Sequence, residues 1–118
     1  MSDNKIAVVI YEPASGDLSR VFRGLRVAAE FKAAGDDVAI VFDGSGVESL
    51  AELSSSDHKL NSLLESLRDN VRGACDYCAN GHGAKDAIEA AGFALKADAD
   101  GEISIRELAL EGRQILNY

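Results

Sequence analysis

"KIAVVIYE", residues 5–12, is a nearly continuous apolar run rich in β-branched side chains, and the turn-forming stretch "PASGD" follows it directly. Such a run is typical of a strand buried on both faces, as the strands of parallel sheets are. A second run, "DVAIVFDG" (37–44), has the same character. The two runs therefore predict two buried strands of a parallel sheet.

The segment between these runs changes its period at Asp17. Apolar side chains then recur at steps of three and four residues, and Gly35 stands where a C-terminal cap belongs. This pattern predicts an amphipathic helix whose apolar stripe contains Leu18, Val21, Phe22, Leu25, Ala28 and Ala29.

The rest of the chain continues this alternation. After the second strand we expect a polar loop, in which "SSSD" (54–57) offers several helix N-caps. There follow a predicted helix over 60–67, a strand over 71–75, a helix over 84–92, a strand over 93–98, a helix capped by Ser104, and a strand over 113–118. Alternating strands and helices indicate right-handed βαβ crossovers. We therefore expect a three-layer, doubly wound α/β fold: a mostly parallel sheet of about five strands, helices on both faces, and one domain over residues 1–118.

Composition limits the function. The chain has 118 residues, 47% of them hydrophobic, which suits a single core. Its net charge of −8 would repel nucleic-acid backbones, so direct binding of RNA or DNA is not expected. The apolar runs are too short to cross a membrane, and "MSDNK" lacks the apolar region of a signal peptide. These features predict a soluble, cytoplasmic protein, and the acidic excess is a weak hint of a salt-adapted source.

"GACDYCANGHGAKD" (73–86) contains both cysteines, Cys75 and Cys78, and one of the two histidines, His82. Offsets of three and seven residues would bring all three side chains to one face of a helix. Glycines on both sides of His82 oppose a continuous helix, so we expect one helical turn from Cys75, a break at "GHG", and then the next helix. Because Cys75 ends the predicted third strand, this segment falls at the carboxyl edge of the sheet, where open α/β folds hold their sites.

Several chemistries fit this cluster. The start of a helix favours the thiolate form of a cysteine, whereas the neighbouring Asp76 opposes it. The two thiols could instead be small apolar groups packed under a turn. A thioredoxin-like pair generally has a proline nearby, and the only proline here is Pro13. Zinc would find three ligands of suitable type in Cys75, Cys78 and His82, one fewer than a structural site needs.

Other motifs give weaker signals. "KADADGEISIRE" (96–107) matches part of a calcium-binding EF-hand loop, but Lys96 occupies the first ligand position. "DGSG" (43–46) and "GHGAKD" (81–86) each contain G-x-G without completing a nucleotide-binding motif. His58 is expected at the surface near a helix start. No cofactor and no metal are expected.

Four features together resemble the DsrE/YchN-like family of small sulfur-relay proteins (DsrE/DsrF/TusD type). They are a strand ending in Cys75, a glycine eight residues later, the helix "AKDAIEAAG", and the tail "SIRELALEGRQILNY". The resemblance implies an α/β protein that assembles into trimers or hexamers. It also implies that Cys75 accepts a sulfane sulfur as a persulfide and passes it to a partner protein, a sulfurtransferase-like activity.

The roles of the other two site residues follow less directly. Cys78 occurs in only some branches of that family, and His82 stands where the sulfur-relay branch has a basic residue. Cys78 could attack a persulfide on Cys75 and leave a disulfide, which would make the chain a thiol–disulfide redox protein. A further alternative is a non-catalytic subunit or a small-ligand-binding module of the same fold. Sulfur donor and acceptor proteins are the partners that the relay would need.

Overall fold

The computed structural model describes residues 2–118 and contains a five-stranded sheet whose neighbouring strands all run parallel, in the order β4-β3-β2-β1-β5. The strands are β1 (Lys5–Ile10), β2 (Asp37–Phe42), β3 (Val71–Cys75), β4 (Leu95–Lys96) and β5 (Gln114–Asn117). The helices are α1 (Leu18–Ala33), α2 (Gly46–Leu53), α3 (Asn61–Ser66), α4 (Asp76–Gly81), α5 (Lys85–Ala90) and α6 (Ile105–Leu110), with a short 3-10 helix, η1 (Arg68–Asn70).

The two apolar runs of the sequence form the middle of the core. In β1 and in β2 every residue after the first is buried. The strands pair in register from Lys5 opposite Asp37 to Ile10 opposite Phe42. Side chains therefore pack on both faces of these strands, which explains why neither strand alternates between apolar and polar residues.

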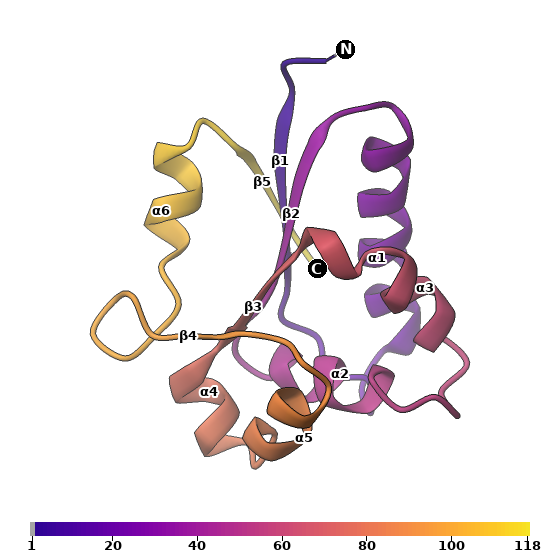
Figure 1. Cartoon of the computed structure of the whole chain (residues 1–118), viewed down its shortest axis with the longest axis vertical. Coiled ribbons are helices and arrows are strands. Elements are labelled where there is room, and N and C mark those ends of the chain that lie inside the picture. Colours follow the sequence, from indigo (N-terminus) through magenta and orange to yellow (C-terminus); the bar gives the residue numbers. More distant parts are fainter. Residues whose placement is uncertain (1) are drawn as a thin grey trace.

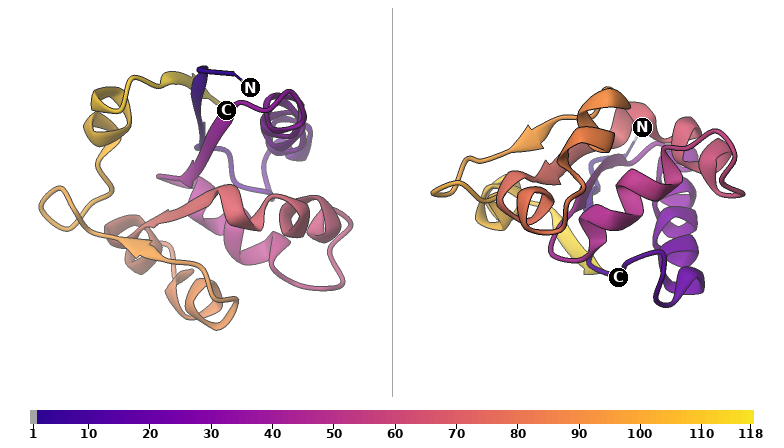
Figure 2. Two further views of the ribbon diagram at one scale, coloured as in Figure 1. Left: turned by 45° about the horizontal axis from the view of Figure 1, so that its top comes forward. Right: turned by 90° about the horizontal axis from the view of Figure 1, so that it is seen from below.

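Helices cover both faces of the sheet, as the sequence predicted. Figures 1 and 2 show α1 and α3 on one side of the strands and α6 alone on the other, with α2, α4 and α5 gathered at the end where β3 finishes. The crossover that contains α6 leads from one edge strand, β4, to the other, β5. The fold is therefore the three-layer α/β arrangement expected from the alternation of elements.

Helix α1 has the boundaries that its sequence predicts. The Asp17 side chain accepts a hydrogen bond from the Ser19 amide (3.0 Å), which caps the first turn. Gly35 follows the helix with a φ of 85°, a conformation that glycine adopts without strain. Val21, Leu25 and Ala28 are fully buried. Asp17 and Gly35 thus mark the two ends of a helix whose buried stripe faces the sheet.

Three local predictions were wrong. Residues 46–53 form helix α2 rather than a polar loop, and Val47, Leu50 and Leu53 bury its inner face. Helix α3 has Leu60 as its N-cap, so none of the "SSSD" side chains caps it. Strand β4 has two residues instead of six, because only Leu95 and Lys96 pair with β3.

An ionic cluster joins α6 to the sheet. Arg72 on β3 makes two hydrogen bonds to Glu111 just after α6, at 2.7 and 3.0 Å. The Arg113 side chain, only 6% exposed, contacts both Glu111 and Asp37. These two arginines hold the pKa of Glu111 at about 2, well below its ordinary value. The cluster therefore ties the connection between α6 and β5 to the start of β2.

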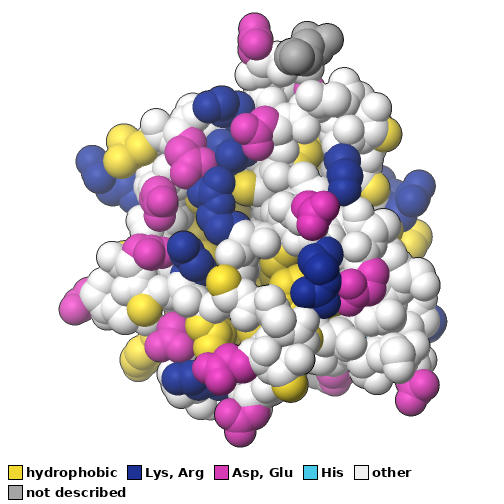
Figure 3. Space-filling view, viewed as in Figure 1, with side chains coloured by type: hydrophobic (Ala, Val, Ile, Leu, Met, Phe, Trp, Pro, Cys, Tyr) yellow, Lys and Arg dark blue, Asp and Glu magenta, His cyan; other side chains and the backbone are white. Residues whose placement is uncertain are grey.

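Surface charge is mixed on the face seen in Figure 1. Figure 3 shows Lys and Arg side chains interspersed with Asp and Glu there, so the acidic excess forms no single patch on this face. Within residues 2–118, no helix combines the length and apolar character needed to cross a membrane.

Candidate functional site

The candidate site lies where three neighbouring strands end. Tyr11 directly follows β1, Asp43 directly follows β2, and Cys75 is the last residue of β3. Because β1, β2 and β3 are adjacent in the sheet, these three positions lie side by side at its carboxyl edge. Open α/β sheets hold their ligands or reacting groups at this edge.

The two cysteines meet at this edge. Cys75 is also the N-cap of α4, and Cys78 lies in the first turn of that helix. Both are free thiols, and Cys75 is buried (1% exposed) whereas Cys78 is half-buried. The Cys78 Sγ lies 3.6 Å from Oδ1 of Asp43. The two sulfurs and the Asp43 carboxylate oxygen all lie within 4.8 Å of one another.

The helical turn after Cys75 and its break are as the sequence predicts. Helix α4 ends at Gly81, and α5 begins at Lys85. Gly83, between them, has a φ of 67°, which an L side chain rarely adopts. The break separates His82 from the run of α4. His82 therefore does not join the two thiols and Asp43. Its Nδ1 lies 2.5 Å from Oε2 of Glu48 on α2.

Two groups at the site have raised pKa values. Burial raises the pKa of the Cys78 thiol to about 12, and the neighbouring Cys75 and Asp43 add to this effect while the backbone of Gly44 opposes it. Burial also raises the pKa of Tyr11, helped by the charge of Asp43 and a hydrogen bond to it. At neutral pH Cys78 is therefore a protonated thiol beside a carboxylate.

The comparison with protein families decides the relationship of this chain. The model of the DsrE/DsrF-like family matches residues 4–118. The chain belongs to that family. No curated protein matches the sequence. Among solved structures, a conserved protein of unknown function from Bacteroides thetaiotaomicron, BT1422, is similar in fold: the TM-score is 0.73 at 20% identity, over 98% of this chain and 95% of that one.

The sequence identified two of the four residues that meet at the candidate site of this DsrE/DsrF-like chain. Cys75 and Cys78 were predicted to lie together, and they do. Asp43 and Tyr11 were missed, because neither belongs to a recognisable motif. A usable signal existed, since each is the first residue after a buried strand and carries a polar group.

The other histidine lies in a local turn. The Leu60 amide donates a hydrogen bond to Nδ1 of His58 (3.0 Å), so His58 helps to shape the entry to α3. The position of His58 near a helix start agrees with the prediction.

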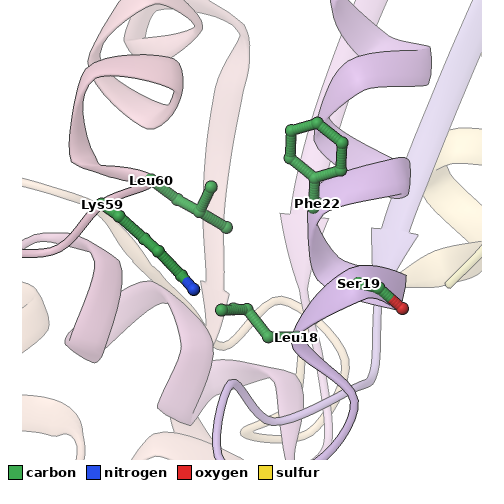
Figure 4. Close-up of a pocket in the computed structure, with 5 residues that line it drawn as sticks. All are labelled: Leu18, Ser19, Phe22, Lys59 and Leu60. Carbon is green, nitrogen blue, oxygen red and sulfur yellow. The ribbon is translucent and has the colours of Figure 1, made fainter.

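One surface cavity of this DsrE/DsrF-like chain lies apart from the cluster. It has a volume of about 340 Å³ and lies between α1 and the segment before α3. Figure 4 shows Leu18 and Leu60 pointing toward one another across it, the Lys59 amine directed at the same gap, and Ser19 pointing away. None of its lining residues is a cysteine, histidine or carboxylate, so this cavity shares no group with the cluster of thiols and Asp43.

Proposed function

We propose that this DsrE/DsrF-like protein carries sulfur on Cys75 and passes it to a partner, a sulfurtransferase-like role. The Cys75 thiolate attacks the outer sulfur of a persulfide donor, R–S–SH. A new S–S bond forms on Cys75, the S–S bond of the donor breaks, and the donor leaves as a thiolate that takes up the proton of the transferred sulfur. An acceptor nucleophile then removes the outer sulfur, and Cys75 leaves as thiolate. Neither step needs an external oxidant or reductant.

The observation that carries this proposal is the pair of reduced thiols, within 4.8 Å of each other, at the carboxyl edge of the sheet. Membership of the DsrE/DsrF-like family over residues 4–118 supports it. The family resemblance implies that the carrier is the cysteine ending the third strand. Cys75 has that position.

Access to Cys75 requires a local movement, since its side chain is buried. Helix α4 is suited to such movement because it has six residues, of which only Ala79 is buried. Local opening of short, weakly packed elements costs far less than global unfolding. Tyr77, 67% exposed on the same helix, is available as the first contact for a donor or acceptor protein.

Cys78 has a second role in the proposal. Its thiol can attack the inner sulfur of a persulfide on Cys75, forming a Cys75–Cys78 disulfide and releasing hydrosulfide. In that step the two cysteines are oxidised and the outer sulfur is reduced. The raised pKa of Cys78 slows this reaction at neutral pH. Cys78 would therefore discharge an idle persulfide slowly while leaving time for transfer.

His82 enters the proposal through α2. Its contact with Glu48 links the end of α4 to α2 and so restrains the C-terminal end of the helix that contains Cys78. A direct catalytic role for His82 remains a prediction. The proposal has three further parts. The protein assembles into a trimer or hexamer, it is located in the cytoplasm, and it has donor and acceptor proteins as partners. Light scattering coupled to size-exclusion chromatography tests the assembly.

The decisive experiment measures the intact mass of the reduced, metal-free protein after exposure to a persulfide donor. We expect a gain of one sulfur atom, which Cys75→Ser abolishes. Cys78→Ser is expected to gain the sulfur and to keep it longer than the parent. Absence of any gain in the parent, or a gain that persists in the folded Cys75→Ser variant, contradicts the proposal.

The burial of Cys75 favours a second candidate function. Cys75 lies within the apolar core, as expected for a non-catalytic subunit or a small-ligand-binding module whose thiols only pack. In that case neither thiol takes up sulfur. Both would also remain unreactive toward an alkylating reagent until the chain is denatured.

A further inference from the structure

The thiol pair and Asp43 together form a set of metal ligands that the sequence did not reveal. One donor atom from each of Asp43, Cys75 and Cys78 lies within 4.8 Å of the other two. The three come from different segments: the end of β2, the end of β3 and the first turn of α4. We propose that this cluster, the Cys–Cys–Asp site, binds one thiophilic divalent cation, for which zinc is the natural probe.

The geometry suits tetrahedral coordination. Zinc binds thiolate sulfur at about 2.3 Å and carboxylate oxygen at about 2.1 Å, so a sulfur and an oxygen on one tetrahedral zinc lie roughly 3.6 Å apart. The separation between Cys78 Sγ and Asp43 Oδ1 is 3.6 Å. The other separations in the cluster, at most 4.8 Å, close by about 1 Å or less through small side-chain rotations.

The spacing of the cysteines supports the same conclusion. Cys75 and Cys78 have the C-x-x-C spacing that many zinc sites use, and here it spans a strand end and a first helical turn. The two thiols therefore approach one point from a backbone that is already ordered.

The carboxylate of Asp43 is held by a partner outside the cluster. The Gly44 amide donates a hydrogen bond to its Oδ1 at 2.8 Å. Tyr11 follows the adjacent strand β1, close enough for the charge of Asp43 to raise its pKa. Such outer partners orient the ligands of metal sites and are themselves important for affinity. Asp43 is thus positioned as a ligand and is not a freely rotating surface carboxylate.

Three protein ligands leave one coordination position open. Because Cys78 is half-buried, the cluster reaches solvent on that side, where water or an external thiol completes the coordination. Binding releases the two thiol protons to solvent and changes no oxidation state. The proposal does not depend on sulfur transfer, and zinc on Cys75 would block its reaction with a persulfide donor.

The test uses the reduced, tag-free, full-length protein titrated with Zn²⁺ against a chromophoric chelator. A parallel titration with Co²⁺ reports thiolate ligands through sulfur-to-cobalt charge-transfer absorption. We expect one metal ion per chain. Loss of an outer partner typically weakens metal binding 10- to 100-fold, so removal of a direct ligand by Cys78→Ser or Asp43→Asn should weaken zinc binding by at least about 100-fold.

Asp76→Asn is the matched control. Asp76 adjoins Cys75 in sequence, but its carboxylate lies 3.7 Å from the Lys85 amine and outside the cluster. This variant should bind zinc within about twofold of the parent. Circular dichroism establishes that each variant is folded.

Three results would overturn the proposal. They are a parent protein that binds less than one zinc ion per chain, a Co²⁺ spectrum without thiolate charge transfer, and a folded Cys78→Ser variant that binds zinc with the affinity of the parent. Equal affinities for Asp43→Asn and Asp76→Asn would remove Asp43 from the site. The first two results need no variant, so they decide the matter even if a variant fails to fold. Sulfur uptake is measured on metal-free protein, so either proposal can fail alone.

Discussion

Gly46 should tolerate no side chain, although it begins a helix in which alanine is normally the better residue. A Cβ at this position would lie 1.9 Å from the carbonyl oxygen of Ile10 and 2.6 Å from its carbonyl carbon. Real Cβ atoms essentially never approach another atom within 3.0 Å, so β1 and α2 would have to separate by more than 1 Å. Both contacting atoms of Ile10 are backbone, so no side-chain rotation relieves the clash.

We therefore expect Gly46→Ala to lower the free energy of unfolding by about 3 kcal/mol, the upper part of the range for overpacked cores. For a chain of 118 residues this corresponds to a fall in Tm of roughly 12 °C. Urea unfolding followed by circular dichroism measures the free energy directly.

Gly81 is the matched control for this substitution. It lies in α4, and a Cβ there would have no neighbour within 4 Å. Gly81→Ala should raise the free energy of unfolding by about 0.5–1 kcal/mol, because alanine loses less backbone entropy than glycine on folding. A Gly46→Ala variant within 1 kcal/mol of the parent would refute the reasoning, because it would show that α2 does not press on the end of β1.

Three further predictions concern the ionic cluster, the core and the thiols. Glu111→Gln should lower the free energy of unfolding by about 1–2 kcal/mol at neutral pH. The full pKa shift of Glu111 corresponds to roughly 3 kcal/mol, but solvent screens the carboxylate and reduces its contribution. Since the pKa of Glu111 is lowered from 4.5 to about 2, this contribution is present above pH 4.5 and is lost as the pH falls toward 2, so urea titrations of parent and variant should converge there. Leu50→Ala, at a fully buried position of α2, should lower the free energy of unfolding by about 2–5 kcal/mol. Leu110→Ala, at a position that is 67% exposed, should change it by no more than about 0.5 kcal/mol in the same assay. Similar losses in the two variants would contradict the burial of α2. Cys78 should be alkylated more slowly in the native protein at pH 8 than in the unfolded chain, because its thiolate is scarce; equal rates by mass spectrometry would count against the raised pKa.

The central strands could be predicted because their physical cause is local. A strand buried on both faces must be apolar at every position, and β1 and β2 are. Helix α2 was missed because its buried apolar side chains are only three, at 47, 50 and 53, among small and polar residues that also suit a loop. The length of β4 was overestimated because an edge strand ends where its neighbour stops pairing, and the segment itself does not encode that point.

The candidate site was half predictable for a related reason. The two cysteines are three residues apart, so helical geometry alone brings them together. Asp43 and Tyr11 are more than thirty residues away from Cys78 in the chain, and only the strand order β3-β2-β1 makes them neighbours of the thiols. His82 shows the converse. Its offset of seven residues from Cys75 would bring the two side chains to one face of a continuous helix, but the helix ends at Gly81.

Helix α2 connects the stability of the fold to the geometry of the site. The segment between β2 and α2 contains only Asp43, Gly44 and Ser45, so the position of Asp43 depends on how closely α2 approaches β1. That approach is set by the missing side chain of Gly46. The same helix carries Glu48, whose contact with His82 restrains the end of α4 and hence Cys78. A substitution that displaces α2 should therefore disturb Asp43 and Cys78 together. We accordingly expect Gly46→Ala to weaken zinc binding even under conditions in which the variant remains fully folded, and parental affinity in that variant would show that the cluster forms independently of α2.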